Sequence, residues 1–178
     1  MSHLWVRTIE LWVAGFIVVF DQATKPLVRQ ALALHESLTI VPGFLNLTHV
    51  RNTGAAFGIM NRVDFPFKTP LLIGLAVIAL VSIAIYATTL PPQQRLARFG
   101  LALVLGGAVG NLIDRIRTGY VLDFVDVYWR EYHFWAFNVA DSAITVGVAM
   151  IVLDLLLEHR AQRRSVGAPE GGNPASGA

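Results

Sequence analysis

The segment PLLIGLAVIALVSIAIYATTL, from Pro70 to Leu90, decides the fold class because it contains no charged residue. About 20 apolar residues in a helix are enough to cross the hydrocarbon core of a bilayer. The whole chain has the same character, since 54% of its 178 residues are hydrophobic, 15% are charged and the mean hydropathy is +0.56. A soluble domain needs a more polar surface, so we predict an integral membrane protein.

Three more apolar stretches have the length of a spanning helix. They run from about Thr8 to Val28, from about Leu96 to Ile113 and from about Val139 to Leu157. Together with the segment 70–90 they predict four transmembrane helices. We expect residues 1–160 to form a single polytopic membrane domain.

The first apolar stretch has an alternative interpretation as a cleaved signal peptide. Arg7 precedes it, and Ala31-Leu32-Ala33 after it resembles a cleavage site. Asp21 and Lys25 interrupt the stretch, however, and such charges normally lie outside the apolar region of a signal peptide. We therefore favour an uncleaved spanning helix.

Two of the connections have the composition of strands. Residues 38–50 are rich in β-branched side chains and break at Pro42-Gly43, and residues 120–129 form a second β-branched and aromatic run. The predicted fold class is therefore all-α and integral to the membrane, with four transmembrane helices and a small extracytoplasmic β-sheet. Residues 165–178 contain almost no large apolar side chain, so we expect a disordered cytoplasmic tail.

Basic residues in short loops predict the orientation of the chain. They lie in the turn between the second and third helices and after the fourth: Arg95, Arg98, Arg160, Arg163 and Arg164. The positive-inside rule then makes both termini cytoplasmic. Many other Lys and Arg residues fall outside, and several belong to the polar motifs described below. Trp129 and Trp135 are expected at headgroup depth on the outer surface.

Composition excludes several kinds of chemistry. The chain has no cysteine, so it has neither a thiol nucleophile nor a Cys-based metal site. Its five histidines lack metal-binding spacings, so we expect no metal and no cofactor. The net charge of +2 is spread along the chain, which gives no indication of nucleic-acid binding.

Polar residues near membrane segments require an explanation, because a charge at the bilayer centre costs about 2.5 to 3.5 kcal/mol. Asp21 and Lys25 have i, i+4 spacing, and an ion pair within one helix is the simplest interpretation. The outer-loop run Asn52–Gly58 contains Gly54 and combines small residues with an amide, which suits either a glycine turn or a close approach to a ligand.

The run Gly106–Arg115 contains a small-xxx-small pair, Gly106 and Gly110, that favours close helix packing. That packing does not explain the polar residues that follow within about one turn: Asn111, Asp114 and Arg115.

Asn138 and Asp141 have the spacing of a helix N-cap and an acidic third residue, and Asp123 alone could be a solvated loop acid. All of these clusters fall on the predicted outer side, at a helix end or in an outer loop. Their convergence favours one site.

Two carboxylates in such a site predict acid–base hydrolysis. They cannot both ionise cheaply, so one keeps its proton and the other is free to activate water. We expect Asp123 and Asp141 to form this pair. The helix N-terminus favours Asp141 as the ionised member, but the proton belongs to the pair and either acid can carry it during turnover. Asp126 is the rival acid, because it lies three residues from Asp123.

Read in order, these motifs resemble the signature of bacterial lipoprotein signal peptidase, also called signal peptidase II, of aspartyl peptidase family A8. The resemblance is carried by Asp21 with Lys25, Asn52 with Gly54, the GGxxGNxxDR run, Asp123-Phe124, and FNVADS at 137–142. The match extends to about Arg160, and the GNxxDR and FNxAD runs in this order are specific.

The resemblance implies an aspartic-type endopeptidase of the bacterial inner membrane, the target of globomycin. It implies cleavage of prolipoproteins before a diacylglyceryl-modified cysteine, in contact with membrane lipids and without a cofactor, and we expect a monomer. The family's catalytic pair corresponds to Asp123 and Asp141. Its substrate-binding or dyad-supporting residues correspond to Asn52, Gly54, Asn111, Arg115 and Asn138. Its further polar positions, expected to be structural, correspond to Asp21, Lys25 and Asp114.

Two other functional classes remain open from the residues alone. Buried polar groups also mark ion or proton transporters, although here they cluster toward one face of the membrane. A scaffold that uses glycine-rich helix packing would make the acids incidental.

Overall fold

The computed structural model describes residues 2–54 and 65–166, and four helices in this part of the chain are long and apolar enough to cross a membrane. They confirm the four predicted spans. The helices are α1 (Ser2–Ala31), α2 (Lys68–Thr89), α3 (Arg95–Thr118) and α4 (Val139–Val166). The strands are β1 (Ser37–Val41), β2 (Leu45–Asn52), β3 (Val121–Trp129) and β4 (Tyr132–His133).

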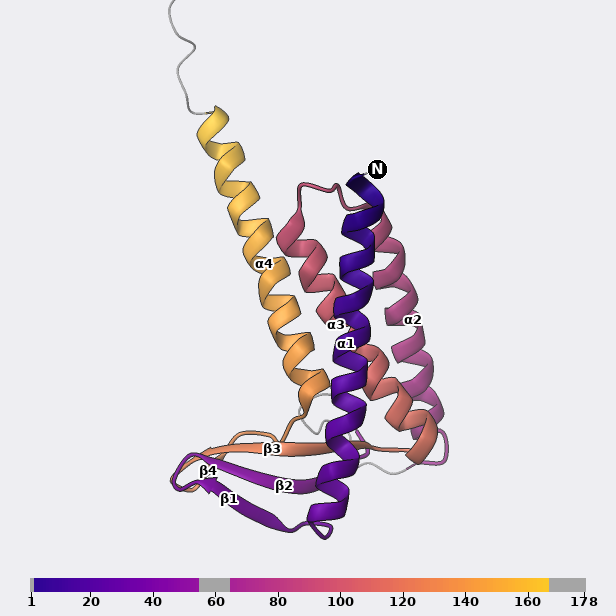
Figure 1. The fold of residues 1–178 in the computed structure, drawn as a ribbon, viewed down its shortest axis with the longest axis vertical. Coiled ribbons are helices and arrows are strands. Elements are labelled where there is room, and N and C mark those ends of the chain that lie inside the picture. The colour runs from indigo at the N-terminus through magenta and orange to yellow at the C-terminus, as the bar shows by residue number, and fades with distance from the viewer. Residues whose placement is uncertain (1, 55–64, 167–178) are drawn as a thin grey trace, which may run out of the picture.

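The helices stand side by side, and the sheet lies across one end of the bundle (Figure 1). The beginning of α1 and the end of α4 lie at the opposite end, as an even number of spans requires. Helix α3 packs against α1, α2 and α4, whereas α2 packs mainly on α3. The C-terminal part of α3 therefore adjoins the N-terminal end of α4 and the C-terminal part of α1.

Glycine in α3 permits this close packing. A Cβ atom at Gly106 would lie 2.7 Å from the Ala14 carbonyl oxygen of α1. A Cβ atom at Gly110 would meet a carboxylate oxygen of Asp21, which also lies on α1. The predicted packing role of Gly106 and Gly110 is confirmed. Gly107, which was not predicted to take part, faces the backbone of Ala140 in α4.

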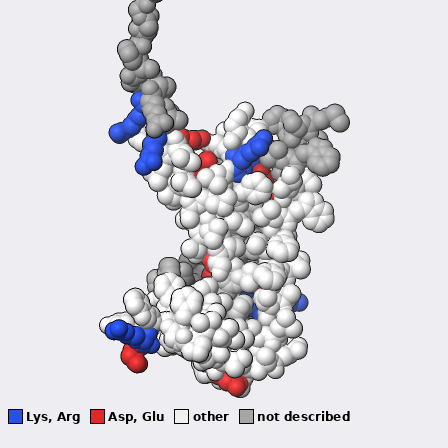
Figure 2. Space-filling model, turned by 60° about the vertical axis from the view of Figure 1, so that its left-hand side comes forward, with Lys and Arg blue, Asp and Glu red and all other residues white. Residues whose placement is uncertain are grey.

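The surface of the bundle is apolar where it would meet lipid. Leu75, Ile78 and Ile85 of α2 are 54 to 64% exposed, an arrangement that a bilayer stabilises and water does not. Figure 2 shows charged side chains mainly toward the two ends of the visible face, with a largely uncharged surface between them.

The sheet is antiparallel, with the strand order β1-β2-β3-β4. The β1–β2 turn contains Gly43 in the left-handed region, with φ of 77°, so the predicted break at Pro42-Gly43 is confirmed. On one face of β3, Leu122 and Phe124 pack with Val28 and Leu32 from the end of α1. This apolar cluster attaches the sheet to the bundle.

The boundaries differ from prediction where sequence signals were weak. Helix α1 continues through Pro26 to Ala31, and α3 continues to Thr118 and ends at Gly119, which has φ of 80°. The short strand β4 was not predicted. The first two residues of the predicted tail, Ser165 and Val166, belong to α4, and the rest of it lies outside the described residues.

Candidate active site

Asp141 lies in the first turn of α4, where it caps the helix together with Asn138. The Asn138 side-chain oxygen accepts a hydrogen bond of 2.9 Å from the Asp141 backbone N–H. In return, the Asn138 backbone N–H donates to Asp141 Oδ2 over 3.2 Å. This reciprocal arrangement is a capping box, and it fixes the direction of the Asp141 carboxyl group.

Asp123 is the third residue of β3, between residues whose side chains pack toward α1. Because side chains alternate along a strand, Asp123 points away from Leu122 and Phe124. Its carboxyl group is 2% exposed and accepts from Asn138 Nδ2 over 2.8 Å. Asn138, itself fully buried, therefore hydrogen-bonds to Asp123 and Asp141 at once.

Asn52 holds the second oxygen of Asp123. It is the last residue of β2, and its Nδ2 donates to Asp123 Oδ2 over 3.0 Å. The Asn52 side-chain oxygen accepts from the Gly54 N–H over 3.0 Å, which is the local bond of an Asx turn. Arg115 Nη2 donates to the Gly54 carbonyl oxygen over 3.0 Å. The motif that begins at Asn52 is thus attached to α3, although its part 55–58 lies outside the described residues.

Asn111 of α3 holds the second oxygen of Asp141. Its Nδ2 donates to Asp141 Oδ1 over 2.8 Å, and its side-chain oxygen accepts from Asn138 Nδ2 over 3.2 Å. Arg115 donates through Nη1 to the Asn111 backbone oxygen, at 3.2 Å. Each of the two acids therefore accepts a hydrogen bond at both carboxyl oxygens.

The surroundings of Asp123 favour its protonated form. Burial raises the pKa of the Asp123 carboxyl from 3.8 to about 7, and the nearby negative charge of Asp141 acts in the same direction. The hydrogen bonds from Asn52 and Asn138 and the charge of Lys25 lower this pKa but do not cancel the shift. A carboxyl group with this pKa can exchange its proton near neutral pH.

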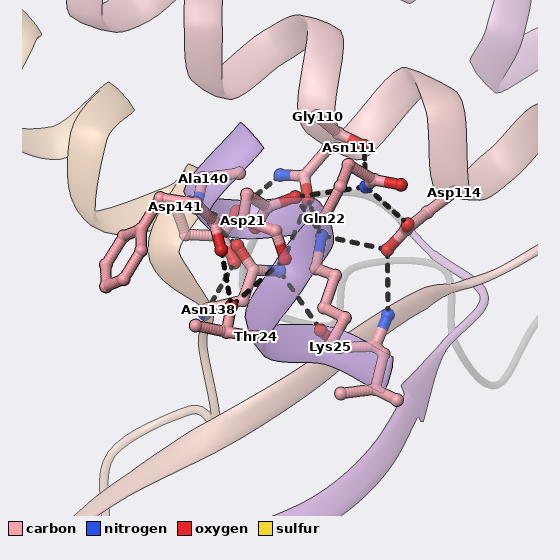
Figure 3. Close-up of polar contacts among 12 residues, drawn as sticks. Asp21, Gln22, Thr24, Lys25, Gly110, Asn111, Asp114, Asn138, Ala140 and Asp141 are labelled. Atoms are coloured by element: carbon pink, nitrogen blue, oxygen red, sulfur yellow. Dashed lines mark hydrogen bonds and ion pairs between the residues drawn. The ribbon is translucent and has the colours of Figure 1, made fainter. Parts of the chain in front are cut away.

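Asp21, Lys25 and Asp114 form a buried ionic cluster, which Figure 3 shows beside Asn111. Lys25 Nζ lies 2.7 Å from Asp21 Oδ2, which is the predicted i, i+4 ion pair. It also lies 2.8 Å from Asp114 Oδ2 on α3. Asp21 Oδ1 accepts from the Ala140 backbone N–H over 3.0 Å, so the cluster joins α1, α3 and the start of α4.

Gln22 belongs to the same cluster, although it was not predicted as a site residue. Its Nε2 donates to Asp114 Oδ1 over 2.9 Å and lies 3.2 Å from Asp21 Oδ2. Its position next to Asp21 on a spanning helix was the available signal. Lys68, also missed, is 6% exposed at the start of α2 and donates to Thr53 Oγ1 over 3.2 Å.

Asp126 has other partners. It lies beside His133, with 2.9 Å between His133 Nδ1 and Asp126 Oδ2, and it accepts from Asn46 Nδ2 over 3.0 Å. Its separation of three residues from Asp123 directs the two side chains to opposite faces of β3. Asp126 is thus not brought together with Asp141 by any of the contacts among the described residues.

Apart from Asp126, the site residues predicted from the sequence lie together at the end of the bundle that carries the sheet. Within residues 2–54 and 65–166, no group of three or more His, Asp or Glu side chains has a metal-binding arrangement. The arrangement can perform proton transfer with two carboxyl groups, one of which holds its proton near neutral pH.

Residues 13–157 match the profile of a family described as signal peptidase (SPase) II, the A8 peptidases. The chain is 47% identical over 152 residues to the lipoprotein signal peptidase of Geobacter metallireducens, covering 85% of this chain and 93% of that protein. It is 50% identical over 143 residues to that of Syntrophotalea carbinolica, covering 80% and 88%. A solved bacterial membrane enzyme has a similar fold, with a TM-score of 0.76, 31% identity and coverage of 93% and 95%.

Proposed function

The chain belongs to the signal peptidase II family of aspartic-type peptidases, and from that premise we propose that Asp123 and Asp141 are its catalytic dyad. The family removes signal peptides from lipoprotein precursors within a membrane. The finer proposal is cleavage immediately before a diacylglyceryl-modified cysteine, by water that the two acids activate. The observation that supports it best is that one buried residue, Asn138, hydrogen-bonds to both acids.

In the proposed reaction Asp141 is ionised and Asp123 is protonated. Asp141 removes a proton from the attacking water while Asp123 donates its proton to the scissile carbonyl oxygen, and a tetrahedral diol forms. The diol collapses as Asp141 passes its proton to the leaving cysteine nitrogen and Asp123 recovers its own. The peptide C–N bond is broken, and one water molecule is consumed.

The neighbouring amides fit these roles. Asn52 and Asn138 donate to Asp123, and Asn111 and the Asn138 backbone donate to Asp141. Such donors hold the carboxyl groups in fixed directions before substrate arrives, which lowers the reorganisation needed in the transition state. The raised pKa of Asp123 supports its assignment as the proton donor.

We also propose that the enzyme lies in the bacterial cytoplasmic membrane with both termini in the cytoplasm. The sheet and the dyad would then face outward, where lipid-modified precursors present their cleavage site. The lipid chains of the substrate would enter sideways from the bilayer, between helices, and the sheet would limit the access of water to the site.

Cleavage of a diacylglyceryl-modified prolipoprotein by purified protein tests the proposal. We expect cleavage of the lipidated substrate and not of its unlipidated form, and inhibition by globomycin. Loss of activity in Asp123→Asn and in Asp141→Asn, with activity retained in Asp126→Asn, would support the dyad. Substantial turnover by either of the first two variants would exclude it.

A further inference from the structure

Lys25 lies next to Asn111, a hydrogen-bond partner of the proposed dyad, and is nearly inaccessible. Its side chain comes from α1 and the residue is 2% exposed. Three oxygens surround the ammonium group: Asp21 Oδ2 at 2.7 Å, Asp114 Oδ2 at 2.8 Å and Asn111 Oδ1 at 3.3 Å. In the described part of the chain, the hydrogen bonds and ion pairs of Lys25 reach neither acid of the dyad. The charge of Lys25 acts on Asp123 through space, whereas any hydrogen-bonded route from Lys25 to the dyad must pass through another residue.

Asn111 is that residue, because its amide has two chemically different ends. The oxygen end accepts from Lys25 Nζ and from Asn138 Nδ2, at 3.3 and 3.2 Å, which fills both lone pairs. The nitrogen end donates to Asp141 Oδ1 over 2.8 Å. A half-turn of the amide would place its NH₂ group against an ammonium group and its oxygen against a carboxylate. Both contacts would be repulsive.

Asn138 alone does not secure this orientation. Its Nδ2 has three acceptors within reach, namely Asn111 Oδ1, Leu122 O and Asp123 Oδ1, but only two protons. The ammonium group of Lys25 has no acceptor form, so it can only face the oxygen end of the Asn111 amide. Arg115 cannot replace it, because the bond from Arg115 goes to the Asn111 backbone oxygen.

We propose that Lys25 is a positioning residue that sets the polarity of the Asn111 amide, so that Asn111 always presents a donor to Asp141. The proposal rests on the proposed function of the dyad. Asp21 and Asp114 have a separate part in it, since they hold the ammonium group in place and balance its charge.

A double-mutant cycle tests this role, with cleavage of the lipidated substrate as the readout. The four proteins are the wild type, Lys25→Met, Asn111→Ala and Lys25→Met/Asn111→Ala. A lost hydrogen bond to a charged group corresponds to a fall in kcat of about 10-fold to 100-fold for Lys25→Met. Because the hydrogen-bonded effect of Lys25 passes through Asn111, adding Lys25→Met to Asn111→Ala should lower kcat much less than Lys25→Met lowers it in the wild type.

The pH dependence of kcat gives a second readout that a purely structural role would not move. Without an oriented donor, the ionised dyad is less stabilised, so the acidic limb of the profile should move to higher pH in Lys25→Met. Asp21, Asp114 and Arg115 are the other charged groups around this cluster. Asp114→Asn keeps the ion pair between Lys25 and Asp21, which still holds the ammonium group beside Asn111, so this variant is the matched control and should shift the limb less.

Lys25→Met leaves two buried carboxylates without their cation, so its folding needs a separate control. Lys25→Met/Asp114→Asn removes one charge of each sign, and its thermal unfolding should return toward that of the wild type while its kcat stays low. Recovery of kcat along with stability would overturn the proposal. So would multiplicative effects in the cycle, an unchanged acidic limb, or failure of the charge-balanced variant to fold, which would make Lys25 a packing residue.

The activities of the two dyad variants test the dyad separately from the role of Lys25. If Asp123→Asn and Asp141→Asn are inactive while the cycle is multiplicative, only the role of Lys25 is wrong. If either of those two variants cleaves substrate at a substantial rate, the proposed function itself fails.

Discussion

Asn138 and Asp141 cap each other at the start of α4, with 2.9 Å from the Asp141 N–H to the Asn138 side-chain oxygen and 3.2 Å from the Asn138 N–H to Asp141 Oδ2. The same Asn138 side chain reaches Asp123 on the sheet. A motif that ordinarily only begins a helix here also holds one acid and touches the other. Under the proposed mechanism, structural and functional roles coincide in Asn138.

Replacing Asn138 should reduce both stability and turnover. Asn138→Ala removes the N-cap, which costs about 1 kcal/mol, and also releases both acids, so we expect kcat to fall about 100-fold or more. Thermal unfolding and cleavage assays measure the two effects. Asn46→Ala is the matched control, because Asn46 donates to the third acid, Asp126, and should leave kcat nearly unchanged. Equal losses in the two variants would contradict the assignment.

The two proposed acids should be far more sensitive than the acid that faces away from them. Asp123→Asn and Asp141→Asn each remove a proton-transfer group, so kcat should fall about 1,000-fold or more. Asp126→Asn should keep kcat within a few-fold of the wild type, because Asp126 pairs with His133 and Asn46. Single-turnover cleavage in detergent or vesicles provides the measurement, and an inactive Asp126→Asn variant would count against the assignment.

Activity should decline on the alkaline side as Asp123 loses its proton. Its pKa is raised to about 7, so kcat/KM should begin to fall near that pH and decrease further above it. Measurements from about pH 5 to about pH 9 would define this limb. A profile that stays flat through about pH 9 would be inconsistent with protonated Asp123 as the proton donor.

The same shift predicts how stability depends on pH. Between 3.8 and about 7 the folded protein holds a proton on Asp123 that the unfolded chain has released. The stabilising contribution of this group is therefore present at low pH and is lost as the pH rises through that window. Asp123→Asn removes the titration, so its thermal midpoint should vary less with pH across this range than that of the wild type. Parallel curves for the two proteins would argue against the shift.

Gly107 should not tolerate a methyl group. A Cβ atom there would overlap the Ala140 carbonyl oxygen and press on Ile144, separating α3 from the start of α4. We expect Gly107→Ala to cost about 1 to 3 kcal/mol and to lower kcat, because Asp141 would be displaced. Gly74→Ala is the control, since a Cβ atom at Gly74 meets nothing within 4 Å. Similar unfolding temperatures for the two variants would refute the packing argument.

Spacing and composition predicted much of this molecule, because membrane spans and local motifs leave signals along the chain. The Asp21–Lys25 pair follows from the period of a helix, and the Asn138–Asp141 box follows from the chemistry of helix starts. That Asp114 would share Lys25 could not be predicted from local spacing, because the contact depends on how α3 packs against α1.

The alternation of side chains along a strand could have separated Asp123 from Asp126, but the prediction did not use it. In the run 120–129, the apolar neighbours Leu122 and Phe124 share one face, which places Asp123 and Asp126 on opposite faces. Alternation alone could therefore have separated the two acids. Gln22 was missed for a different reason, since a glutamine beside an ion pair has no distinctive spacing.

The attachment of the sheet through Leu122 and Phe124 has a mechanical consequence. Asp123 belongs to a sheet at one end of the bundle, whereas Asp141 belongs to a helix that is long and apolar enough to cross a membrane. Any tilt of the sheet relative to the helices would change the distance between the carboxyl groups of the two acids. A bilayer that restrains the tilt of the helices would therefore help to set the separation of the two carboxyl groups.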